Sequence, residues 1–493
     1  MGKGDISSVI DYLEFDAAST STPSIVHVSG DVYAVAYRGV DSDGWLVTFT
    51  IGSTGQIGAA TIASFEFAPA DTCDFPYIIK IVDSSNVFAI VYRDQNNDGT
   101  LITLTIANDG TIGGAAIDTF IFDIVLCNNP HMVQISGDIY AIVYEAGGSL
   151  GKLLTIDIDS VGQIGAIAVD TLTFDGVNGE EAKIINVSGT IYAIGYMGSN
   201  KVKVVTVDIQ DDGTIAAAVT DSVDFGLPCV AFGDMIEITT GKFLIAYTEN
   251  TTNDGFLITI GITAAGVIDT SVTDSLEFET TFATDIHLLK VTTNFYIFVY
   301  RDTNIKGVVS TISVTSTGKI GLVLDTLMFD ADWCIWPVII NISSTSSAAV
   351  YAIAYQGLAT DGFVKTVSID KRLGVWRSSD AGVTWHECDA GNDPQRIAFG
   401  LYSEEDSLVL ETDLAYIFYS RDNGSFTYIP SGTFTGSPED LKVDPLIYGV
   451  TYVGTDEGLY KSFDYGGSFH LMYSGATEIA LGALSDLYTV ADD

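Results

Sequence analysis

The chain has 493 residues, of which 47% are hydrophobic, and it carries 64 acidic against 21 basic residues, a formal net charge of −43. This length allows two or three domains or one large repetitive one, and the hydrophobic content excludes global disorder. Such an excess of negative charge repels a phosphate backbone, so it excludes nucleic acid as a partner. No stretch reaches the roughly 20 apolar residues of a membrane span, so we expect no membrane insertion.

The first residues, MGKGDISSVIDYLEFD, lack the apolar core of a signal peptide. The acidity suits a salty or calcium-containing medium, and we therefore expect a protein exposed outside a cell, on a cell surface or on a virus particle. Export by another route, release with a virus and removal of a leader are all compatible with this. Five cysteines are too few for a disulfide framework and show no zinc-ligand spacing.

Two sequence markers repeat at the same interval along most of the chain. A tyrosine that ends a strand of the type VYAVAY recurs every 51–55 residues, and so does the phenylalanine of a strand of the type LEFD. Two independent markers with one period establish a sequence repeat. The markers are Tyr37, Tyr92, Tyr144, Tyr196, Tyr247, Tyr300 and Tyr355, and Phe15, Phe67, Phe122, Phe174, Phe225, Phe278 and Phe329.

Each repeat predicts four strands, because Val, Ile, Tyr, Phe and Thr dominate and turn residues separate the runs. In the first repeat the strands are residues 23–30, 31–38, 44–51 and 56–67. Four antiparallel strands per repeat of about 50 residues are typical of a β-propeller blade. We therefore predict an all-β fold with a seven-bladed β-propeller over residues 1–372, in which the N-terminal strand, residues 9–16, closes blade 7.

The stretch YRDQNNDGTL places oxygen ligands at Asp94, Asn96 and Asp98 before a glycine, as a calcium loop does. The closing carboxylate of such loops is missing, since Thr105 and Ile102 stand where an EF-hand and an integrin-type propeller loop need one. Two interpretations are open. The stretch is either a turn between the second and third strands of a blade, or a weak Ca²⁺ site that a backbone carbonyl or a neighbouring blade completes.

In a propeller, the loops between second and third strands share one face with the loops that enter each first strand, beside the mouth of the central channel. Arg38, Arg93 and Arg301 occupy one repeat position on that face. They are candidates for binding an anion or carboxylate, because a guanidinium binds carboxylates bidentately. The alternative is that each arginine pairs with an aspartate of its own loop, such as Asp94 or Asp302.

Trp333 and Trp336 lie in the most aromatic of the loops that enter a first strand. They are candidates either for stacking on a sugar ring or for filling the top of the blade. Nearby positions of the same loops hold cysteine in four blades and a small residue in three others, so we interpret them as packing sites and not as a metal or redox ring. These residues are Cys73, Cys127, Cys229 and Cys334, with Thr20, Gly179 and Ala283.

From residue 373 the repeat changes. The stretches SSDAGVTW, SRDNGSFTY and SFDYGGSFH share the pattern Ser-x-Asp-x-Gly at an interval of 42 residues. This segment resembles the Asp-box (BNR) repeat family of β-propellers, and the resemblance covers residues 373–493 only. In that family the box is a hairpin whose Asp and Ser/Thr side chains bond local backbone, so the resemblance implies a structural role. The residues concerned are Ser378, Asp380, Gly382, Ser420, Asp422, Gly424, Ser462, Asp464 and Gly466.

Residues 373–493 hold about three blade equivalents. A separate small module, an extension of the ring to ten blades and completion by another chain are all compatible with the pattern, and we favour a separate all-β module. We expect this module to join the protein to an assembly, such as a homo-oligomer.

The function that we expect is non-catalytic binding or attachment, with a glycan or protein recognised through the loop face. The alternative is a structural subunit of a fibre, tail or surface layer that binds no small ligand. A glycoside hydrolase of sialidase-like architecture is less favoured, because the arginines do not match that family's arrangement and the five histidines share no spacing. A pair of carboxylates hidden among 64 acidic residues is still compatible with hydrolysis.

Overall fold

The computed structural model describes residues 4–69, 71–81, 86–345 and 348–371, together with ten strands and residues 468–469 between residues 376 and 474. The chain forms two compact units, one of residues 4–345 and 349–369 and the other mainly of residues 370–493. Among the described residues, no helix is long and apolar enough to cross a membrane.

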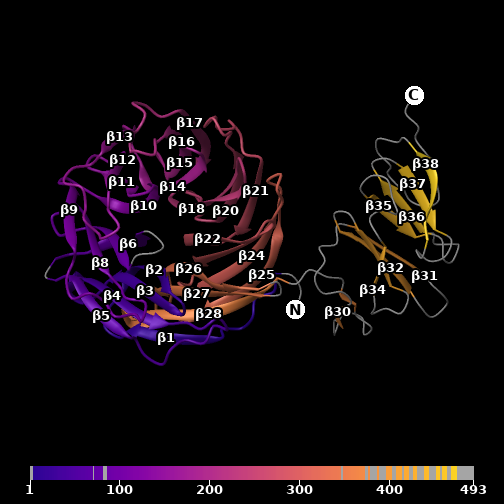
Figure 1. The fold of residues 1–493 in the computed structure, drawn as a ribbon, viewed down its shortest axis with the longest axis horizontal. Helices are drawn as coiled ribbons and strands as arrows, with labels where there is room; N and C mark the ends of the chain where they lie inside the picture. Colours follow the sequence, from indigo (N-terminus) through magenta and orange to yellow (C-terminus); the bar gives the residue numbers. More distant parts are fainter. Residues whose placement is uncertain are drawn as a thin grey trace. The chain divides into compact units, whose positions relative to one another are not determined.

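Seven four-stranded antiparallel sheets make up the first unit, which confirms the predicted seven-bladed propeller (Figure 1). The first strand of each blade lies innermost, and these strands contact one another around the ring. Blades 1 to 3 are β2 (Ser21–Ser29), β3 (Val32–Arg38), β4 (Gly44–Thr50) and β5 (Ala63–Ala68); β6 (Asp74–Ile81), β7 (Val87–Arg93), β8 (Gly99–Thr105) and β9 (Asp118–Asp123); β10 (Asn128–Ser136), β11 (Ile139–Ala146), β12 (Leu150–Asp157) and β13 (Asp170–Asp175).

The remaining blades follow the same plan. Blades 4 to 6 are β14 (Glu180–Ser188), β15 (Ile191–Met197), β16 (Lys201–Asp208) and β17 (Asp221–Pro228); β18 (Ala231–Thr239), β19 (Lys242–Thr248), β20 (Gly255–Gly261) and β21 (Asp274–Glu279); β22 (Thr284–Thr292), β23 (Phe295–Arg301), β24 (Gly307–Val314) and β25 (Ile320–Asp330). Blade 7 is β26 (Ile335–Ser344), β27 (Ala348–Gln356), β28 (Gly362–Asp370) and the N-terminal strand β1 (Asp11–Asp16).

The N-terminal strand closes the ring as predicted. β1 pairs antiparallel with β28, with Asp11 opposite Thr366. Just before it, Ile6 forms a β-bridge with Ile369. Equivalent bridges close the turn between the third and fourth strands in blades 1 to 5, so the residues before β1 supply the missing half of that turn in blade 7. The free edge that β28 would otherwise present is thereby covered.

The fourth strands of blades 1 to 5 are shorter than predicted. β5 begins at Ala63, whereas the prediction began at residue 56. The bridge between Ile51 and Ile57 closes a tight turn whose Gly55 has a φ of +88°, and the chain reaches the sheet only after it. A left-handed residue of this kind favours glycine.

The hydrophobic core lies between the blades and not within any one of them. The second strands are almost entirely buried, and seven hydrophobic clusters each join residues of two adjacent blades. The cluster at the ring closure joins Leu13 and Phe15 of β1 to Tyr33 and Phe49 of blade 1. Each blade can therefore bury its faces only when both neighbours are in place.

One buried hydrogen bond recurs at every joint between blades. A threonine of the third strand donates to the carbonyl oxygen of a glycine at 2.5–2.7 Å. This glycine lies in the next blade, in the segment that precedes its fourth strand. In the bond that reaches the N-terminal segment, Thr311 donates to Gly4. The donors and acceptors are Thr48–Gly110, Thr103–Gly162, Thr155–Gly213, Thr206–Gly266, Thr259–Gly318, Thr311–Gly4 and Thr366–Gly55.

The second unit contains three antiparallel sheets among its described residues. One sheet has two strands and the other two have four strands each, paired in chain order. The strands are β29 (Trp376–Arg377) and β30 (His386–Glu387); β31 (Arg396–Leu401), β32 (Ser407–Asp413), β33 (Tyr416–Ser420) and β34 (Phe426–Ile429); β35 (Pro438–Val443), β36 (Thr451–Thr455), β37 (Gly458–Ser462) and β38 (His470–Ser474).

Candidate functional site

The loops predicted to share one face of the propeller are hydrogen-bonded to each other. The residue one place before each first strand, or two places before it in blade 5, donates its N–H to a carbonyl oxygen in the loop between second and third strands of the preceding blade, for example Cys127 to Asn97 at 3.0 Å. All seven donor residues are buried. The seven donors are the cysteines and small residues that the sequence repeat predicted for this position. They are Thr20, Cys73, Cys127, Gly179, Cys229, Ala283 and Cys334.

The three arginines pair with aspartates, although not with those of their own loops. Arg38 donates to Asp74 at 2.6 Å, and Arg93 donates to the other oxygen of the same carboxylate. The Arg301 Nε lies 3.2 Å from Asp285 Oδ2. Asp74 and Asp285 lie at the starts of first strands. A ligand carboxylate at these arginines would therefore compete with a carboxylate of the protein.

The stretch proposed as a calcium loop forms a tight turn. Asp94 Oδ1 accepts hydrogen bonds from the backbone N–H groups of Asn96 and Asp98 at 2.8 and 2.9 Å. Asp302 makes the same two bonds in blade 6, where Lys306 replaces the last acidic residue. Throughout the described part of the chain, no three His, Cys, Asp or Glu side chains gather closely enough to hold a metal ion. The geometry favours the turn interpretation.

The two candidate tryptophans have different surroundings. Trp333 lies in the loop and donates its backbone N–H to Asp330. Trp336 is the second residue of β26, has a φ of +52° and donates its backbone N–H to Asp285 at 3.4 Å. Both side chains are half-buried. Only Trp336 therefore belongs to an innermost strand.

The Asp-box positions are described only in part. Ser420 ends β33 and Ser462 is buried in β37, while Ser378, Asp380, Gly382, Asp422, Gly424, Asp464 and Gly466 lie outside the described residues. The strands that flank each box pair antiparallel: β29 with β30, β33 with β34, and β37 with β38.

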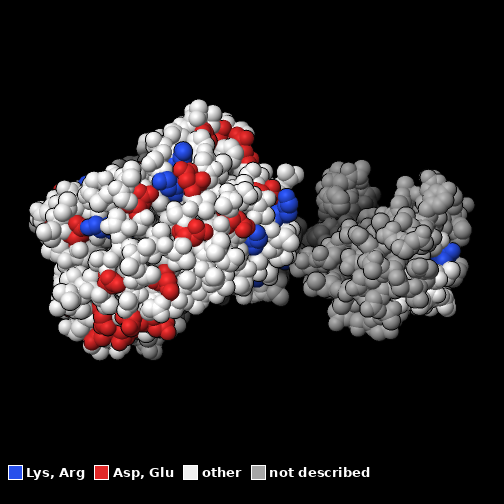
Figure 2. Space-filling model, turned by 90° about the horizontal axis from the view of Figure 1, so that it is seen from above, with Lys and Arg blue, Asp and Glu red and all other residues white. Residues whose placement is uncertain are grey.

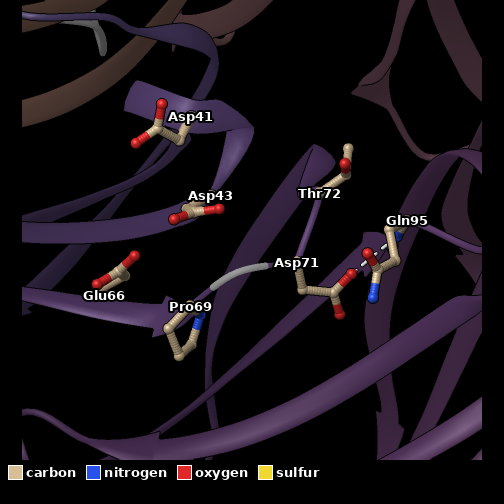
Figure 3. A pocket seen from close by; sticks show the side chains of 7 residues that line it. All are labelled: Asp41, Asp43, Glu66, Pro69, Asp71, Thr72 and Gln95. Carbon is tan, nitrogen blue, oxygen red and sulfur yellow. Dashed lines mark hydrogen bonds between the residues drawn. The ribbon is translucent and has the colours of Figure 1, made fainter.

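An acidic cavity of about 580 Å³ lies on the loop face at blades 1 and 2 (Figure 3). A hydrogen bond to Asp43 is the main cause that raises the pKa of the Glu66 carboxyl. Figure 2 shows that acidic side chains outnumber basic ones on the visible side of the molecule. The cavity, which four acidic side chains line, therefore repels anions. The lining residues are Asp41, Asp43, Glu66, Pro69, Asp71, Thr72 and Gln95.

A ring of side chains that we call the rim ring surrounds the mouth of the propeller axis. It consists of the second residue of each first strand, where the backbone bulges before regular pairing begins. In six of the seven blades this residue is not glycine and yet has a φ between 45° and 56°. Such a left-handed conformation is unfavourable and re-aims the side chain. The seven positions are Thr22, Phe75, Asn129, Glu181, Phe232, Asp285 and Trp336. Phe232 differs from the others, because it lacks the left-handed conformation and its side chain is buried in the core between blades 4 and 5.

Two residues deeper, the fourth residues of the first strands form a second ring, the axial ring. All seven lie at one level, because each pairs with the equivalent residue of its second strand, as His131 does with Val143 and His287 with Val299. Five of the seven members have an ionisable side chain. The members are Ser24, Tyr77, His131, Lys183, Asp234, His287 and Val338.

Electrostatic interactions across the ring show that axial-ring side chains face one another. Burial, followed by the charge of Asp234 three blades away, raises the pKa of Tyr77. Burial, followed by the charges of Lys183 and His287, lowers the pKa of His131. His131 and His287 also stand three blades apart. At neutral pH the phenol therefore stays protonated and His131 stays uncharged.

Contacts between neighbouring blades hold the axial ring in place. Ser24, His131 and Asp234, in blades 1, 3 and 5, each accept a hydrogen bond from a backbone N–H of the next first strand, at 3.0–3.4 Å. The ring of Tyr77 contacts that of His131 in a tilted arrangement, with centroids 4.6 Å apart and an interplanar angle of 48°. His287 Nε2 lies 3.9 Å from Asp234 Oδ2, and a third of the His287 side chain, 34%, is accessible.

A third ring, the aliphatic ring, lies two residues deeper again. Every member is a half-buried Val, Ile or Leu. Polar side chains occupy the next position in all seven strands, toward the opposite face. The propeller axis is therefore layered, with an apolar layer between two polar ones. The members are Val26, Ile79, Val133, Ile185, Ile236, Leu289 and Ile340.

Sequence reasoning did not find the axial ring, although a signal was present. Aligning the seven first strands places Ser, Tyr, His, Lys, Asp, His and Val at one position, two residues before a position that is always Val, Ile or Leu. The search for a shared histidine spacing missed it because only His131 and His287 carry histidine there.

Neither the family models nor the curated proteins contain a match to this chain. Solved structures that resemble it include the periplasmic gluconolactonase of Pseudomonas aeruginosa, at 11% identity and a TM-score of 0.47, covering 63% of this chain and 86% of that one. Sqt1 of Saccharomyces cerevisiae matches at 8% identity and a TM-score of 0.44, covering 87% and 100%. An ulvan lyase, a polysaccharide lyase, matches at 10% identity and a TM-score of 0.46, covering 73% and 96%.

Proposed function

We propose that this protein is a non-catalytic binding propeller, exposed on a cell surface or a virus particle, that holds a glycan at the rim ring. The rim ring carries the proposal, because it sets aromatic side chains beside amide and carboxyl groups at one level. A sugar offers apolar C–H faces and hydroxyl groups, and it is bound by such mixtures of aromatic and polar side chains.

Three features of the rim ring support a glycan. Trp336 of blade 7 and Phe75 of blade 2 lie on either side of blade 1. Both residues are half-buried, so each retains accessible aromatic surface. Asn129 and Glu181, in adjacent blades, add hydrogen-bonding groups. The backbone strain at these positions is compensated by the surrounding sheets, which fix the side chains before a ligand arrives.

A second candidate function is that of an assembly subunit without a small ligand. The antiparallel sheets of residues 376–474 favour it, since repeated β units outside the ring offer further surface for other copies of the chain. This role is compatible with glycan binding, and an attachment protein commonly needs both.

The proposal is tested on a glycan array with the labelled full chain, in the presence and absence of EDTA. We expect binding to a defined set of glycans that is unaffected by EDTA, because the Asp94 turn uses its own carboxylate internally. Trp336→Ala and Asn129→Ala should each weaken binding at least tenfold. Tyr12→Ala is the matched control, because this aromatic residue is 65% exposed on the outermost strand of blade 7.

Three outcomes would contradict the proposal. Silence across the array together with concentration-dependent self-association would favour the assembly subunit. Equal loss in the Tyr12→Ala control would move binding away from the rim ring. Release of cleaved sugar from any glycan would make the protein an enzyme.

A further inference from the structure

We infer that the axial ring is a binding site for a small hydroxylated monocarboxylate, such as a sugar acid, that enters from the rim. The inference goes beyond glycan binding at the rim ring, because it concerns different residues and a free acid suffices to test it. The hydrogen-bond donors and acceptors of the axial ring determine the chemical class of the ligand.

Three hydrogen-bond donors occupy consecutive blades and form what we call the donor arc, namely Tyr77, His131 and Lys183. Tyr77 donates through its phenol, which stays protonated. The His131 Nδ1 accepts a hydrogen bond from the Ile184 N–H at 3.4 Å, so the proton of the uncharged ring lies on Nε2 and is free to donate. Neither the Tyr77 phenol nor the Lys183 ammonium group makes a hydrogen bond or ion pair with any described residue.

An acceptor faces the donor arc. Asp234 lies in blade 5, opposite Tyr77, and its carboxylate is fixed by the backbone N–H groups of Met235 and Leu288 at 2.8 and 3.0 Å. Next to it, the buried His287 Nδ1 has no partner among the described residues. A ligand that places a carboxylate on the donor arc and a hydroxyl group on Asp234 and His287 satisfies both sides.

The charges favour a monoanion over a dianion. Lys183 is the only lysine or arginine of the axial ring, and Asp234 is its only acidic residue. Above them, Glu181 and Asp285 of the rim ring add negative charge at the entrance, partly neutralised by protonation of Glu181 and by Arg301. Lys183 can pair with a single carboxylate, whereas a phosphate dianion brings a second negative charge into a ring that already holds Asp234.

The aliphatic ring limits how the ligand binds. Seven Val, Ile and Leu side chains form an apolar layer directly below the axial ring. A charged ligand gains nothing there and loses its hydration, so it stops at the axial ring. We therefore expect entry from the rim, so that a longer acidic glycan would insert only its terminal residue.

The test uses the histidine ring signals of the full chain in nuclear magnetic resonance. His131 and His287 report on the axial ring, while His27 lies on the far side of the aliphatic ring and bonds to Gly30. His131→Gln and His287→Gln assign the signals. The probes are D-galacturonate, its uncharged methyl ester, acetate and inorganic phosphate, all at one pH and ionic strength.

We expect D-galacturonate to shift the His131 and His287 signals saturably and to leave the His27 signal unchanged. The methyl ester, acetate and phosphate should bind at least tenfold more weakly. Lys183→Met should remove the response at least tenfold. Lys80→Met is the matched control, because Lys80 also lies in a first strand but beyond the aliphatic ring, where its Nζ bonds to Val28.

Absence of a saturable shift with D-galacturonate in the folded wild-type chain overturns the inference, whatever the glycan array shows. Phosphate binding as tight as D-galacturonate binding overturns the monocarboxylate class. Equal loss in Lys80→Met places the effect on the fold and not on the axial ring. A further arm with a galacturonate trimer, free and methylated at its terminal residue only, distinguishes a free acid from the end of a glycan.

Discussion

Tyr37 of β3 donates a hydrogen bond of 2.7 Å to Asp16 of β1 and so joins the first blade to the seventh. The Phe15 ring meets the same tyrosine edge-on, with centroids 5.3 Å apart. The two sequence markers are therefore the two halves of one contact between blades. The tyrosine bond recurs as Tyr144–Asp123, Tyr196–Asp175, Tyr300–Glu279 and Tyr355–Asp330.

Tyr37→Phe should lower the free energy of unfolding by about 1–2 kcal/mol, because it removes a hydrogen bond to a carboxylate that is partly buried. The matched control is Tyr247→Phe, since the residue after the marker Phe225 is Gly226 and offers no carboxylate. The control should change stability by less than about 0.5 kcal/mol. Urea unfolding followed by far-ultraviolet circular dichroism measures both, and equal losses would contradict the assignment.

Removing residues 1–16 should destabilise the propeller strongly and promote aggregation. The deletion uncovers the edge of β28 and removes Leu13 and Phe15 from the closing core. A milder variant, Thr311→Val, keeps the strand but removes the bond to Gly4, and should cost about 1 kcal/mol. Thermal melting with size-exclusion chromatography checks both, and an unchanged melting temperature of the deletion would refute the closure.

Stability should fall as the pH rises through the range in which Glu181 titrates. Burial raises the pKa of Glu181 from 4.5 to about 7 in the folded protein. The folded state therefore holds a proton that the unfolded state releases, so the contribution is complete below pH 4.5 and is lost between about pH 4.5 and 7. The loss is on the order of 1–3 kcal/mol.

Glu181→Gln should flatten this pH dependence, because the amide does not titrate. Its oxygen can still accept the hydrogen bond that the Phe232 N–H donates to Glu181 at 2.6 Å. Urea unfolding at intervals from pH 4.5 to 7.5 gives the slope for both proteins. Identical slopes would show that another group controls stability in this range.

The four described cysteines should be unreactive in the native protein. Burial raises the pKa of Cys229 to about 12 and raises the pKa of Cys73, Cys127 and Cys334 as well. A thiol that stays protonated and has no accessible surface reacts slowly. Alkylation at pH 8, read by mass spectrometry of peptides, should label these sites only in denaturant. Rapid native labelling of any of them would contradict the packing interpretation.

The sequence predicted the architecture well because the contacts that build it repeat. Seven copies of Tyr and Phe at one interval reveal the number of blades, and the unmatched LEFD strand at residues 9–16 reveals the closure. The aspartates that pair with the arginines could not be predicted in the same way. Asp74 lies opposite Arg93 in the pairing of β6 with β7, and it also reaches Arg38 of the preceding blade. Neither contact follows from loop sequence alone.

The axial ring was missed for a different reason. Its members lie about 50 residues apart and only His131 and His287 share a residue type, so nothing along the chain links Tyr77, Lys183 and Asp234. They become neighbours only because a sevenfold ring brings the fourth residue of each first strand to one level. A chemical motif search reads along the chain and cannot find such a set.

The clasp formed by β1 affects how the protein acquires its ligand sites. Asp11 and Thr366, which meet in that clasp, are 355 residues apart. A nascent chain must therefore keep its earliest strand waiting until the last blade has emerged, and contacts between such distant segments form slowly. The axial ring does not exist until all seven blades have assembled, so binding of a ligand there would show that the propeller has finished folding.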